Sequence, residues 1–271
     1  MKNCIAIAAA LTVAWPSATV AQGKDATAEF EKFRAEMEES NPAELFELKG
    51  EELWKAKRGP KKVSLEESCD LGQGIGKVEG AYVRSPRYFP DADAVMDIER
   101  RIVWCMVEKQ GFKFEDIAKK PFQGANDNNA PDITNLVTFV AMGSRNMKFE
   151  MPLDDPKVRD AFETGKAMAG YRAGPYDFSC NTCHGADGRR IRMQNLPNLS
   201  TPEGALRGVL GWPGYRMTGG VMLTSQWRMN DCFRQQRFPE PKYASQAVTN
   251  LIAYMTGNAN GQLYKGPGIK R

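Results

Sequence analysis

Apolar residues recur at the spacing of one helix face in two segments of the second half of the chain. In the first segment, 158–168, they stand three and four residues apart: Val158, Ala161 and Phe162. The second segment, 247–255, is expected to end near Gly257, because glycine commonly follows the last turn of a helix. The Asn-, Gly- and Pro-rich run 123–132 predicts a loop. The pattern therefore indicates a mainly α-helical protein.

Residues 1–21 have the three-part pattern of a secretory signal peptide. A short positive start precedes the apolar segment 4–13, and Thr19-Val20-Ala21 offers a cleavage site before Gln22. Cys4 does not indicate a lipoprotein, because no apolar stretch precedes it. No later segment approaches the length of a membrane-spanning helix. The sequence predicts an exported, periplasmic protein without stable membrane insertion, in a compartment that tolerates disulfides.

The chain after the leader divides at changes in composition. Residues 22–60 form a charged N-terminal arm, and a boundary marked by Pro152 and Pro156 separates residues 61–150 from residues 151–271. About 250 residues remain without the leader, which is enough for one large domain or two of ordinary size.

The charge balance excludes one class of partner and leaves another open. Lys and Arg number 37 against 33 Asp and Glu, so the formal net charge is +4. Such a mild excess does not predict nucleic-acid binding. The basic run 55–62 could dock an acidic partner, although a solvated surface is the favoured interpretation.

The run Cys180-Asn181-Thr182-Cys183-His184 contains the only histidine of the chain. Cys-x-x-Cys-His is the attachment pattern of c-type haem: two thiols one helical turn apart reach the two vinyl groups of a porphyrin, and the histidine becomes the proximal iron ligand. A structural zinc site needs four ligands, and no second Cys/His pair is present. A thioredoxin-like motif needs a βαβ pattern, which the sequence lacks. The motif predicts one covalently bound haem c.

The two halves of the chain share an internal repeat. Three segments recur in the same order: 68–74 with 179–185, Arg101-x-x-x-Cys105 with Arg228-x-x-x-Cys232, and 134–139 with 249–254. In the first copy Gly72 replaces the second haem cysteine, and Gln73 replaces the ligand histidine. The repeat predicts two tandem cytochrome-c-like helical domains, of which the N-terminal one, 61–150, is haem-less.

The repeat also predicts a disulfide between Cys69 and Cys105. Cys69 stands at the old attachment position, and Cys105 matches Cys232. If Cys232 is an iron ligand, both cysteines of the first copy once faced the same haem and are close enough to pair. The bridge would close a loop of about 37 residues, worth roughly 3–4 kcal/mol in the chain-entropy model. Two separate buried thiols are the alternative.

The second axial ligand of the iron is open, because His184 supplies only one. Electron-carrying cytochromes use methionine, and five methionines are candidates: Met193, Met217, Met222, Met229 and Met255. Cys232 is the rival. It matches Cys105 in the repeat and has no obvious disulfide partner, so it is the odd thiol of an exported chain. A structural buried thiol is the remaining interpretation of Cys232.

Arg228 lies four residues before Cys232, so on a helix the two side chains share one face. A guanidinium there would favour the thiolate and could bind a small oxyanion in bidentate fashion. Pairing with a haem propionate and a purely solvating role are the alternatives. The matching Arg101 of the haem-less copy gives these alternatives weight.

Beyond the motif and the repeat, the chain resembles the SoxA family, the catalytic cytochromes of sulfur-oxidising bacteria. The resemblance covers nearly all of the chain after the leader. Its specific segments are Gly50-Glu51-Glu52-Leu53-Trp54, Arg58-Gly59-Pro60-Lys61, Ser64-Leu65-Glu66, Cys69-Asp70-Leu71-Gly72, Pro86-Arg87-Tyr88-Phe89, Cys180-Asn181-Thr182-Cys183-His184-Gly185 and Arg228-Met229-Asn230-Asp231-Cys232. Because Gly72 and Gln73 interrupt the first haem motif, the chain is similar to the monohaem form of the family.

The resemblance implies an L-cysteine S-thiosulfotransferase that joins thiosulfate to a cysteine of the carrier protein SoxYZ and passes two electrons to c-type haem. It implies a heterodimer with a small SoxX-type cytochrome c. Carried over by motif, Cys180 and Cys183 hold the haem and His184 is the proximal ligand. Cys232 is then the distal ligand and the reactive sulfur, persulfidated during turnover, and Arg228 holds the thiosulfate dianion.

Two other function classes compete with this one. A periplasmic electron-transfer cytochrome c without sulfur chemistry would place methionine on the iron and leave Cys232 buried and inert. An inactive scaffold subunit would only support a partner cytochrome, and the intact motif 180–185 argues against it. A sulfur bound to iron is not free to attack, so Cys232 either leaves the iron or reacts at an outer sulfur; the sequence leaves both routes open.

Overall fold

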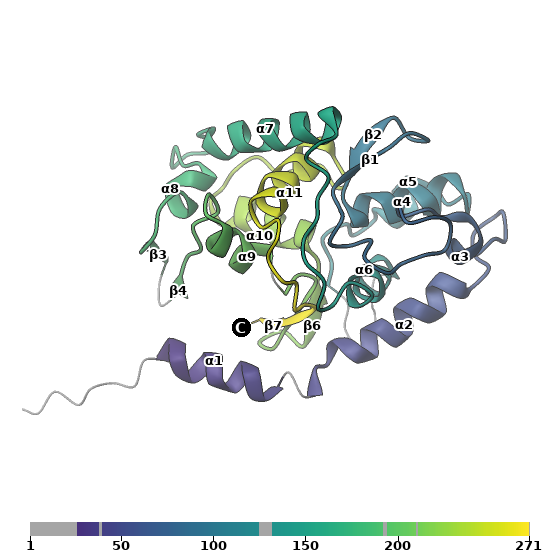
Figure 1. Cartoon of the computed structure of the whole chain (residues 1–271), viewed down its shortest axis with the longest axis horizontal. Coiled ribbons are helices and arrows are strands. Elements are labelled where there is room, and N and C mark those ends of the chain that lie inside the picture. The colour runs from purple at the N-terminus through teal and green to yellow at the C-terminus, as the bar shows by residue number, and fades with distance from the viewer. Residues whose placement is uncertain (1–25, 38–39, 125–131, 192–193, 210, 271) are drawn as a thin grey trace, which may run out of the picture.

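The computed structural model describes residues 26–37, 40–124, 132–191, 194–209 and 211–270. The leader 1–21 and most of the loop predicted at 123–132 lie outside these ranges. Over the described residues the protein is mainly helical, as the apolar pattern predicts (Figure 1).

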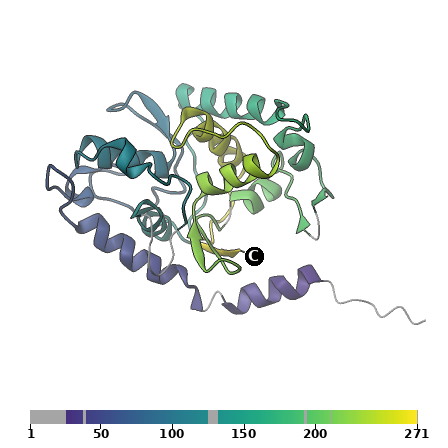
Figure 2. The same ribbon diagram turned by 180° about the vertical axis from the view of Figure 1, so that it is seen from behind.

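Most of the helices come in two successive groups. In chain order they are α1 (Ala26–Met37), α2 (Ala43–Lys55), α3 (Leu65–Ser68), α4 (Ile98–Glu108), α5 (Phe114–Ile117), α6 (Asp132–Met142), α7 (Pro156–Gly170), α8 (Cys180–His184), α9 (Pro202–Val209), α10 (Ser225–Gln235) and α11 (Gln246–Asn258). Helix α1 lies along the edge of the molecule in both ribbon views (Figures 1 and 2).

Short strands join the helices. They are β1 (Arg87–Phe89), β2 (Ala94–Met96), β3 (Arg190–Ile191), β4 (Gln194–Asn195), β5 (Gly214–Arg216), β6 (Val221–Leu223) and β7 (Gly268–Lys270). β1 pairs with β2, and β3 with β4, both antiparallel. β5 is the central strand of a small sheet in the order β6-β5-β7, antiparallel to β6 and parallel to β7.

Each half contains a close crossing of its first and last long helices. α2 crosses α6 at Gly50, where an added Cβ would lie 2.1 Å from the backbone oxygen of Asn135. α7 crosses α11 at Gly165, where an added Cβ would lie 1.9 Å from the backbone oxygen of Asn250. Asn135 and Asn250 are equivalent positions of the sequence repeat. Only glycine permits so close an approach of two backbones, so the repeat preserves a packing contact.

Both predicted helices are present, and the second ends where it was expected to. Segment 158–168 lies within α7, and segment 247–255 lies within α11. Helix α11 ends at Asn258, directly after Gly257, in agreement with the predicted end near Gly257. A Cβ at Gly257 would lie 2.5 Å from the ring of Phe162, so this glycine makes room for a side chain of α7.

Helix α2 lies inside the segment expected to be a charged arm, 22–60. Its Leu53 and Trp54 are buried in the hydrophobic core that also contains Cys69, Cys105 and residues of α6. Charged residues cover only its outer face, where Lys55 bonds Glu51. Part of the arm is therefore a core element of the first half.

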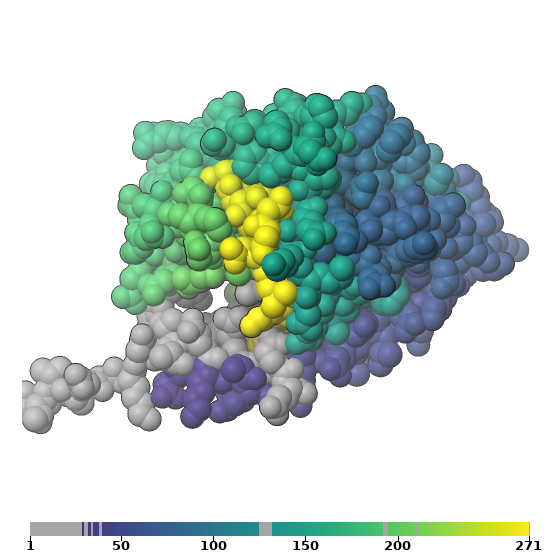
Figure 3. Space-filling view, viewed as in Figure 1, coloured from purple at the N-terminus to yellow at the C-terminus, as the bar shows by residue number. Residues whose placement is uncertain are grey.

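The two halves share a common core. Buried residues of the first half, Val83 and Phe149 among them, pack with Val209, Ala259 and Tyr264 of the second. The C-terminal residues, yellow in Figure 3, form a strip between the green residues of the second half and the teal and blue residues of the first. The two halves are thus closely packed on each other.

Buried hydrogen bonds also join the two halves. Two carboxyl groups at the start of α4 accept them from side chains of the second half. Asp97 accepts bonds from the Gln226 side chain at 3.0 Å and from Thr249 Oγ1 at 2.7 Å. Glu99 accepts one from the Tyr243 hydroxyl at 2.8 Å. Asp97 and Glu99 are only 5% and 4% exposed. Because buried polar groups need partners, this network fixes how the halves meet.

No helix among the described residues combines the length and the apolar character that crossing a membrane requires.

Cys69 and Cys105 form a disulfide with an S–S distance of 2.03 Å, and both are fully buried. Since a bridge over this separation restricts the unfolded chain, the double variant Cys69→Ala/Cys105→Ala should lose about 2–4 kcal/mol of unfolding free energy. Urea denaturation of the haem-loaded protein measures the loss. Adding a reductant should lower the unfolding free energy of the wild type toward that of the variant. It should leave the unfolding free energy of the variant unchanged. Equal stability of the two proteins would contradict the prediction.

Burial, together with the neighbouring charge of Asp97, raises the pKa of Glu99 from 4.5 to about 8. The unfolded chain therefore releases this proton at lower pH than the folded chain, so stability should fall as pH rises from about 4.5 to about 8. Glu99→Gln should remove the contribution of Glu99 to this pH dependence. That contribution is on the order of 4 kcal/mol of unfolding free energy across the window. Denaturant unfolding at several pH values tests this. Glu150→Gln, a change at an exposed carboxylate, is the control and should keep the wild-type slope; the same slope in Glu99→Gln would contradict the prediction.

Candidate functional site

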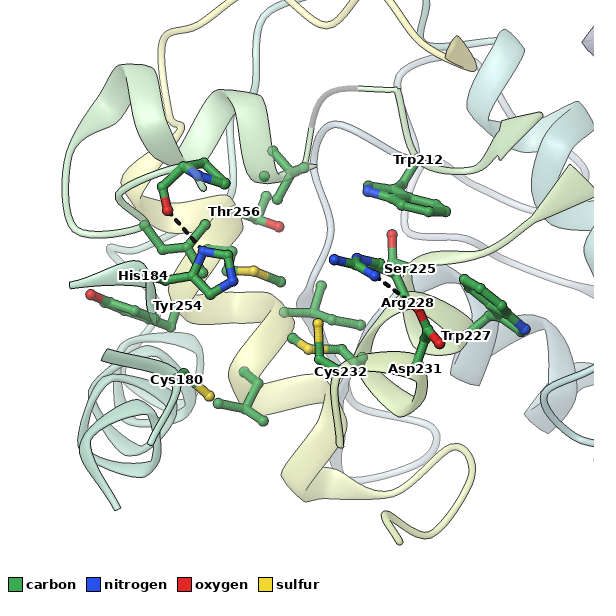
Figure 4. A pocket seen from close by; sticks show the side chains of 18 of the residues that line it. Cys180, His184, Trp212, Ser225, Trp227, Arg228, Asp231, Cys232, Tyr254 and Thr256 are labelled. Carbon is green, nitrogen blue, oxygen red and sulfur yellow. Dashed lines mark hydrogen bonds and ion pairs between the residues drawn. The ribbon is translucent and has the colours of Figure 1, made fainter. Parts of the chain in front are cut away.

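A cavity of about 770 Å³ lies in the second half of the molecule, with part of its wall formed by the first half. Its wall includes every residue predicted to hold haem or to act on substrate: Cys180, Cys183, His184, Arg228 and Cys232. Figure 4 shows the His184 ring and the Cys232 sulfur directed into the same space, with the Arg228 guanidinium beside it. The fold thus brings two separate sequence motifs together.

The haem-attachment motif forms a short helix of its own, α8. Ser179 begins it with a capping box: the Ser179 hydroxyl accepts from the Thr182 amide at 3.2 Å, and the Thr182 hydroxyl accepts from the Ser179 amide at 2.9 Å. Cys180 and Cys183 therefore lie one turn apart, unpaired and half-buried. This is the spacing that two thioether bonds to one porphyrin require.

His184 is fixed in the orientation of a metal ligand. Its Nδ1 lies 2.8 Å from the backbone oxygen of Pro197, so Nδ1 carries the proton and Nε2 is left with its lone pair. Burial is the main cause that lowers the pKa of His184, and the positive charge of Arg228 lowers it further. A neutral imidazole held through its other nitrogen is the form that binds iron.

Helix α10 carries Arg228 and Cys232 on one face, as their spacing predicts. Thr224 begins the helix by accepting a bond from the Trp227 amide. Burial raises the pKa of the Cys232 thiol, and Arg228 is the strongest influence in the opposite direction. The arginine is thus close enough to favour the thiolate, which is the reactive form.

Asp231 is a residue of the site that the sequence reasoning missed. It is 4% exposed and accepts bonds from Arg228 at 2.8 Å, from Arg234 at 2.7 Å and from Gln235 at 2.8 Å. The position of an acid three residues after Arg228 was the available signal. Asp231 holds the Arg228 guanidinium in place, so the ion pair of Arg228 in this structure is with an aspartate of its own helix.

The structure narrows the methionine alternatives for the second axial ligand. Met229 and Met255 line the cavity. Met222 is fully buried in a separate core cluster with Phe46, and Met193 lies outside the described residues. The described residues contain no group of three or more Cys, His, Asp or Glu side chains that could hold a metal ion.

The equivalent segment of the first half cannot form the same motif. α3 ends at Ser68, and the backbone of Cys69 is extended rather than helical. Gly72 has φ of +87°, and a Cβ there would lie 2.4 Å from the Arg87 side chain. Gln73 accepts a bond from Arg84 at 2.9 Å. The Arg87 side chain therefore fills the space that a cysteine side chain would need at position 72, and Arg84 holds Gln73 at the position of the histidine.

The family model described as "SoxA/TsdA, cytochrome c domain" matches residues 49–149, which lie in the first half. The chain is 44% identical over 241 residues to the L-cysteine S-thiosulfotransferase subunit SoxA of Hydrogenophilus thermoluteolus, covering 89% of this chain and 87% of that one. It is 30% identical to the protein of the same name from Hydrogenobacter thermophilus, covering 85% of this chain and 82% of that one.

The fold is shared with a solved structure. It is described as the crystal structure of SoxXA from P. pantotrophus, with a TM-score of 0.70 and 23% sequence identity over 89% of this chain and 84% of that one. The similarity in sequence extends over most of this chain and most of its relatives, through the motifs that form the cavity. On this evidence the chain belongs to the SoxA family.

Proposed function

We propose that this protein is an L-cysteine S-thiosulfotransferase subunit that joins thiosulfate to a cysteine of the carrier SoxYZ, working with a SoxX-type cytochrome c in the periplasm. The observation that carries the proposal is the meeting of two motifs in one cavity: the haem-attachment residues of α8 and the Arg228–Cys232 pair of α10. The family membership and the names of the relatives support it. The leader sequence 1–21 supports export.

The proposed architecture is two cytochrome-c-like units, the first without haem. The repeated helix crossing at Gly50 and Gly165 supports two units of the same design. The family model for a cytochrome c domain falls on 49–149, the half without the Cys-x-x-Cys-His motif. Because α2 packs into the first core, the first unit begins with α2 rather than at residue 61, and the boundary near residue 150 is kept.

One haem c fits the residues present. Cys180 and Cys183 would form the thioether bonds, and His184 Nε2 would bind the iron on the proximal side. Cys232, which lines the same cavity, would be the second ligand of the iron. When bound, the haem supplies an acceptor for electrons leaving the sulfur chemistry. The disulfide of Cys69 and the packing of Arg87 over Gly72 support a single haem per chain.

The reaction forms one sulfur–sulfur bond. The terminal sulfur of thiosulfate bonds to the carrier cysteine, whose thiol loses its proton, and two electrons leave. Arg228 would hold the sulfonate end of thiosulfate, since a guanidinium offers parallel donors to an oxyanion. Asp231 keeps that guanidinium in place. Cys232 is the proposed reactive sulfur, persulfidated during turnover, and the enclosed cavity wall around it strengthens the attraction of Arg228 for an anion.

A second candidate is an electron-transfer cytochrome c without sulfur chemistry. The presence of Met229 and Met255 on the cavity wall favours it, because either thioether would then replace Cys232 on the iron. The two candidates differ in the ligand they place there, and a spectroscopic measurement separates them.

Cys232→Ala should abolish thiosulfate-dependent cytochrome reduction in the presence of SoxYZ and SoxX, because the reactive sulfur is gone. Electron paramagnetic resonance of the oxidised protein should show the low-spin signal of sulfur-anion ligation in the wild type and its loss in the variant. Met229→Leu and Met255→Leu are the matched controls and should retain both signal and activity. A methionine-type signal that survives Cys232→Ala, with full activity, would leave only the electron carrier.

Arg228→Gln should lower kcat/KM for thiosulfate about 10- to 100-fold, the usual effect of losing a charge-assisted hydrogen bond to an ionic reactant. Arg228→Lys should recover only part of the loss, because lysine has no planar pair of donors. Arg234→Gln is the control: Arg234 also pairs with Asp231, but its side chain is 71% exposed. Equal effects of the two glutamine variants would show that Arg228 only supports the helix.

A further inference from the structure

Two carboxyl groups of the first half form part of the cavity wall. Asp97 and Glu99 line the cavity together with Arg228 and Cys232 of α10, and both are buried. They lie two residues apart at the start of α4, and the negative charge of Asp97 acts on Glu99. Because two carboxyl groups in one buried cluster cannot easily both be ionised, this pair can hold a proton inside the protein.

Asp97 is the charged member of the pair. One of its oxygens accepts bonds from the Arg100 amide at 3.1 Å and from the Gln226 side chain at 3.0 Å. The other oxygen accepts a bond from Thr249 Oγ1 at 2.7 Å. Donors on both oxygens suit a carboxylate, which only accepts hydrogen bonds. The Arg100 side chain is the cation of this group, and its charge interacts with that of Asp97.

Glu99 is the member of the pair that can gain and lose a proton. It accepts a bond from the Tyr243 hydroxyl at 2.8 Å, and its other partners are the side chain of Thr224 and the backbone of Gln226. None of these three partners carries a positive charge. Burial and the charge of Asp97 raise the pKa of Glu99 to about 8, so its charge changes close to neutral pH.

The titratable side chains that face Glu99 from other elements are two tyrosines. Tyr243 precedes α11, and Tyr82 precedes β1. Burial is the main cause that raises the pKa of each, so both hydroxyls stay protonated over the range in which Glu99 titrates. Of the groups around this site, Glu99 is therefore the one that changes charge near pH 8.

Hydroxyl groups lead from Glu99 toward the substrate side of the cavity. Thr224, a partner of Glu99, is followed by Ser225, whose Oγ lies 3.2 Å from the Tyr82 hydroxyl. Ser225 stands three residues before Arg228, so the two share a face of α10, and Figure 4 shows both at the cavity. A hydroxyl both donates and accepts, so this row of groups can pass a proton.

Ser85 adds a further polar group to the same wall. It lies in the turn that follows Tyr82 and lines the cavity. Its hydroxyl oxygen is buried and has no hydrogen-bond partner within the part of the chain that the structure describes. Since buried polar groups are normally bonded to protein or to water, this oxygen is suited to hold a water molecule beside the hydroxyls.

We propose that Glu99 is a buried proton-accepting residue of the haem cavity, which binds a proton when the haem gains an electron and releases it when the electron leaves. For each electron gained, one proton from solvent forms an O–H bond on the Glu99 carboxylate. The same bond breaks on reoxidation, and the proton returns to solvent. The added negative charge strengthens the hold on the proton, because carboxyl and haem share one enclosed cavity. The proposal rests on the haem of the proposed function and not on its sulfur chemistry.

The test is a redox titration of the haem-loaded protein at several pH values without thiosulfate. In the wild type the midpoint potential should fall as pH rises above about 8, where only the reduced protein keeps the Glu99 proton. The fall is at most about tenfold per pH unit in the ratio of oxidised to reduced haem, or about 59 mV. Glu99→Gln should abolish it. Glu150→Gln, a change at an exposed carboxylate, is the control and should keep the wild-type dependence.

Tyr243→Phe provides a test that does not depend on the folding of Glu99→Gln. The Tyr243 hydroxyl favours the ionised form of Glu99, so its removal should move the start of the fall to higher pH while the slope remains. The phenyl ring can keep the edge-on packing against Phe122. A structural role of Glu99 alone would not produce this shift. The wild-type pH dependence in both Glu99→Gln and Tyr243→Phe would overturn the proposal.

The outcomes separate this proposal from the proposed function. A pH-dependent potential that Glu99→Gln abolishes, in a protein that does not turn over thiosulfate with SoxYZ and SoxX, would keep the proton-accepting residue and reject the thiosulfotransferase. Turnover of thiosulfate by a protein whose Glu99→Gln variant retains the wild-type pH dependence would do the reverse.

Discussion

Asp97 and Glu99 place two carboxyl groups where the halves of the protein meet, and the position of α10 depends on their hydrogen bonds. Glu99 faces Thr224 and the backbone of Gln226 at the first turn of α10, and Asp97 binds the Gln226 side chain. Because Cys232 lies about two turns further along this rigid helix, its place relative to α8 follows from how these carboxyl groups hold the first turn. The first half thus acts on the site through α10, although it lacks the haem motif.

At the position of the haem-attachment motif, the first half differs from the second in its backbone as well as in its residues. A haem-attachment helix needs its cysteines in successive turns, as Cys180 and Cys183 have in α8. In the first half the helix ends before Cys69, and Gly72 adopts a left-handed backbone beneath Arg87. Cys69 is instead bound to Cys105 in a disulfide within the hydrophobic core of this half. Restoring two side chains would therefore not restore the site.

The sequence predicts those parts of the site that depend on local spacing. The attachment motif, the shared face of Arg228 and Cys232 and the disulfide all follow from short motifs and from the repeat. Contacts that depend on tertiary packing were not predictable. Asp97 and Glu99 are far from α8 and α10 in the chain and line the cavity only because the two halves pack together. The charged arm was interpreted from composition, and composition does not reveal that Leu53 and Trp54 of α2 face the core.

Two charged side chains in the cavity act on Cys232 in opposite directions, which the sequence alone does not reveal. Burial raises the pKa of Cys232, Arg228 lowers it and Asp231 raises it again. The same aspartate that fixes the Arg228 guanidinium therefore also offsets part of its charge. An arginine neutralised in this way is a precise donor of hydrogen bonds but a weaker attractant for a dianion in solution. The geometry of Arg228 therefore suits it to orient an anion near Cys232 through paired hydrogen bonds more than to draw one in from solution.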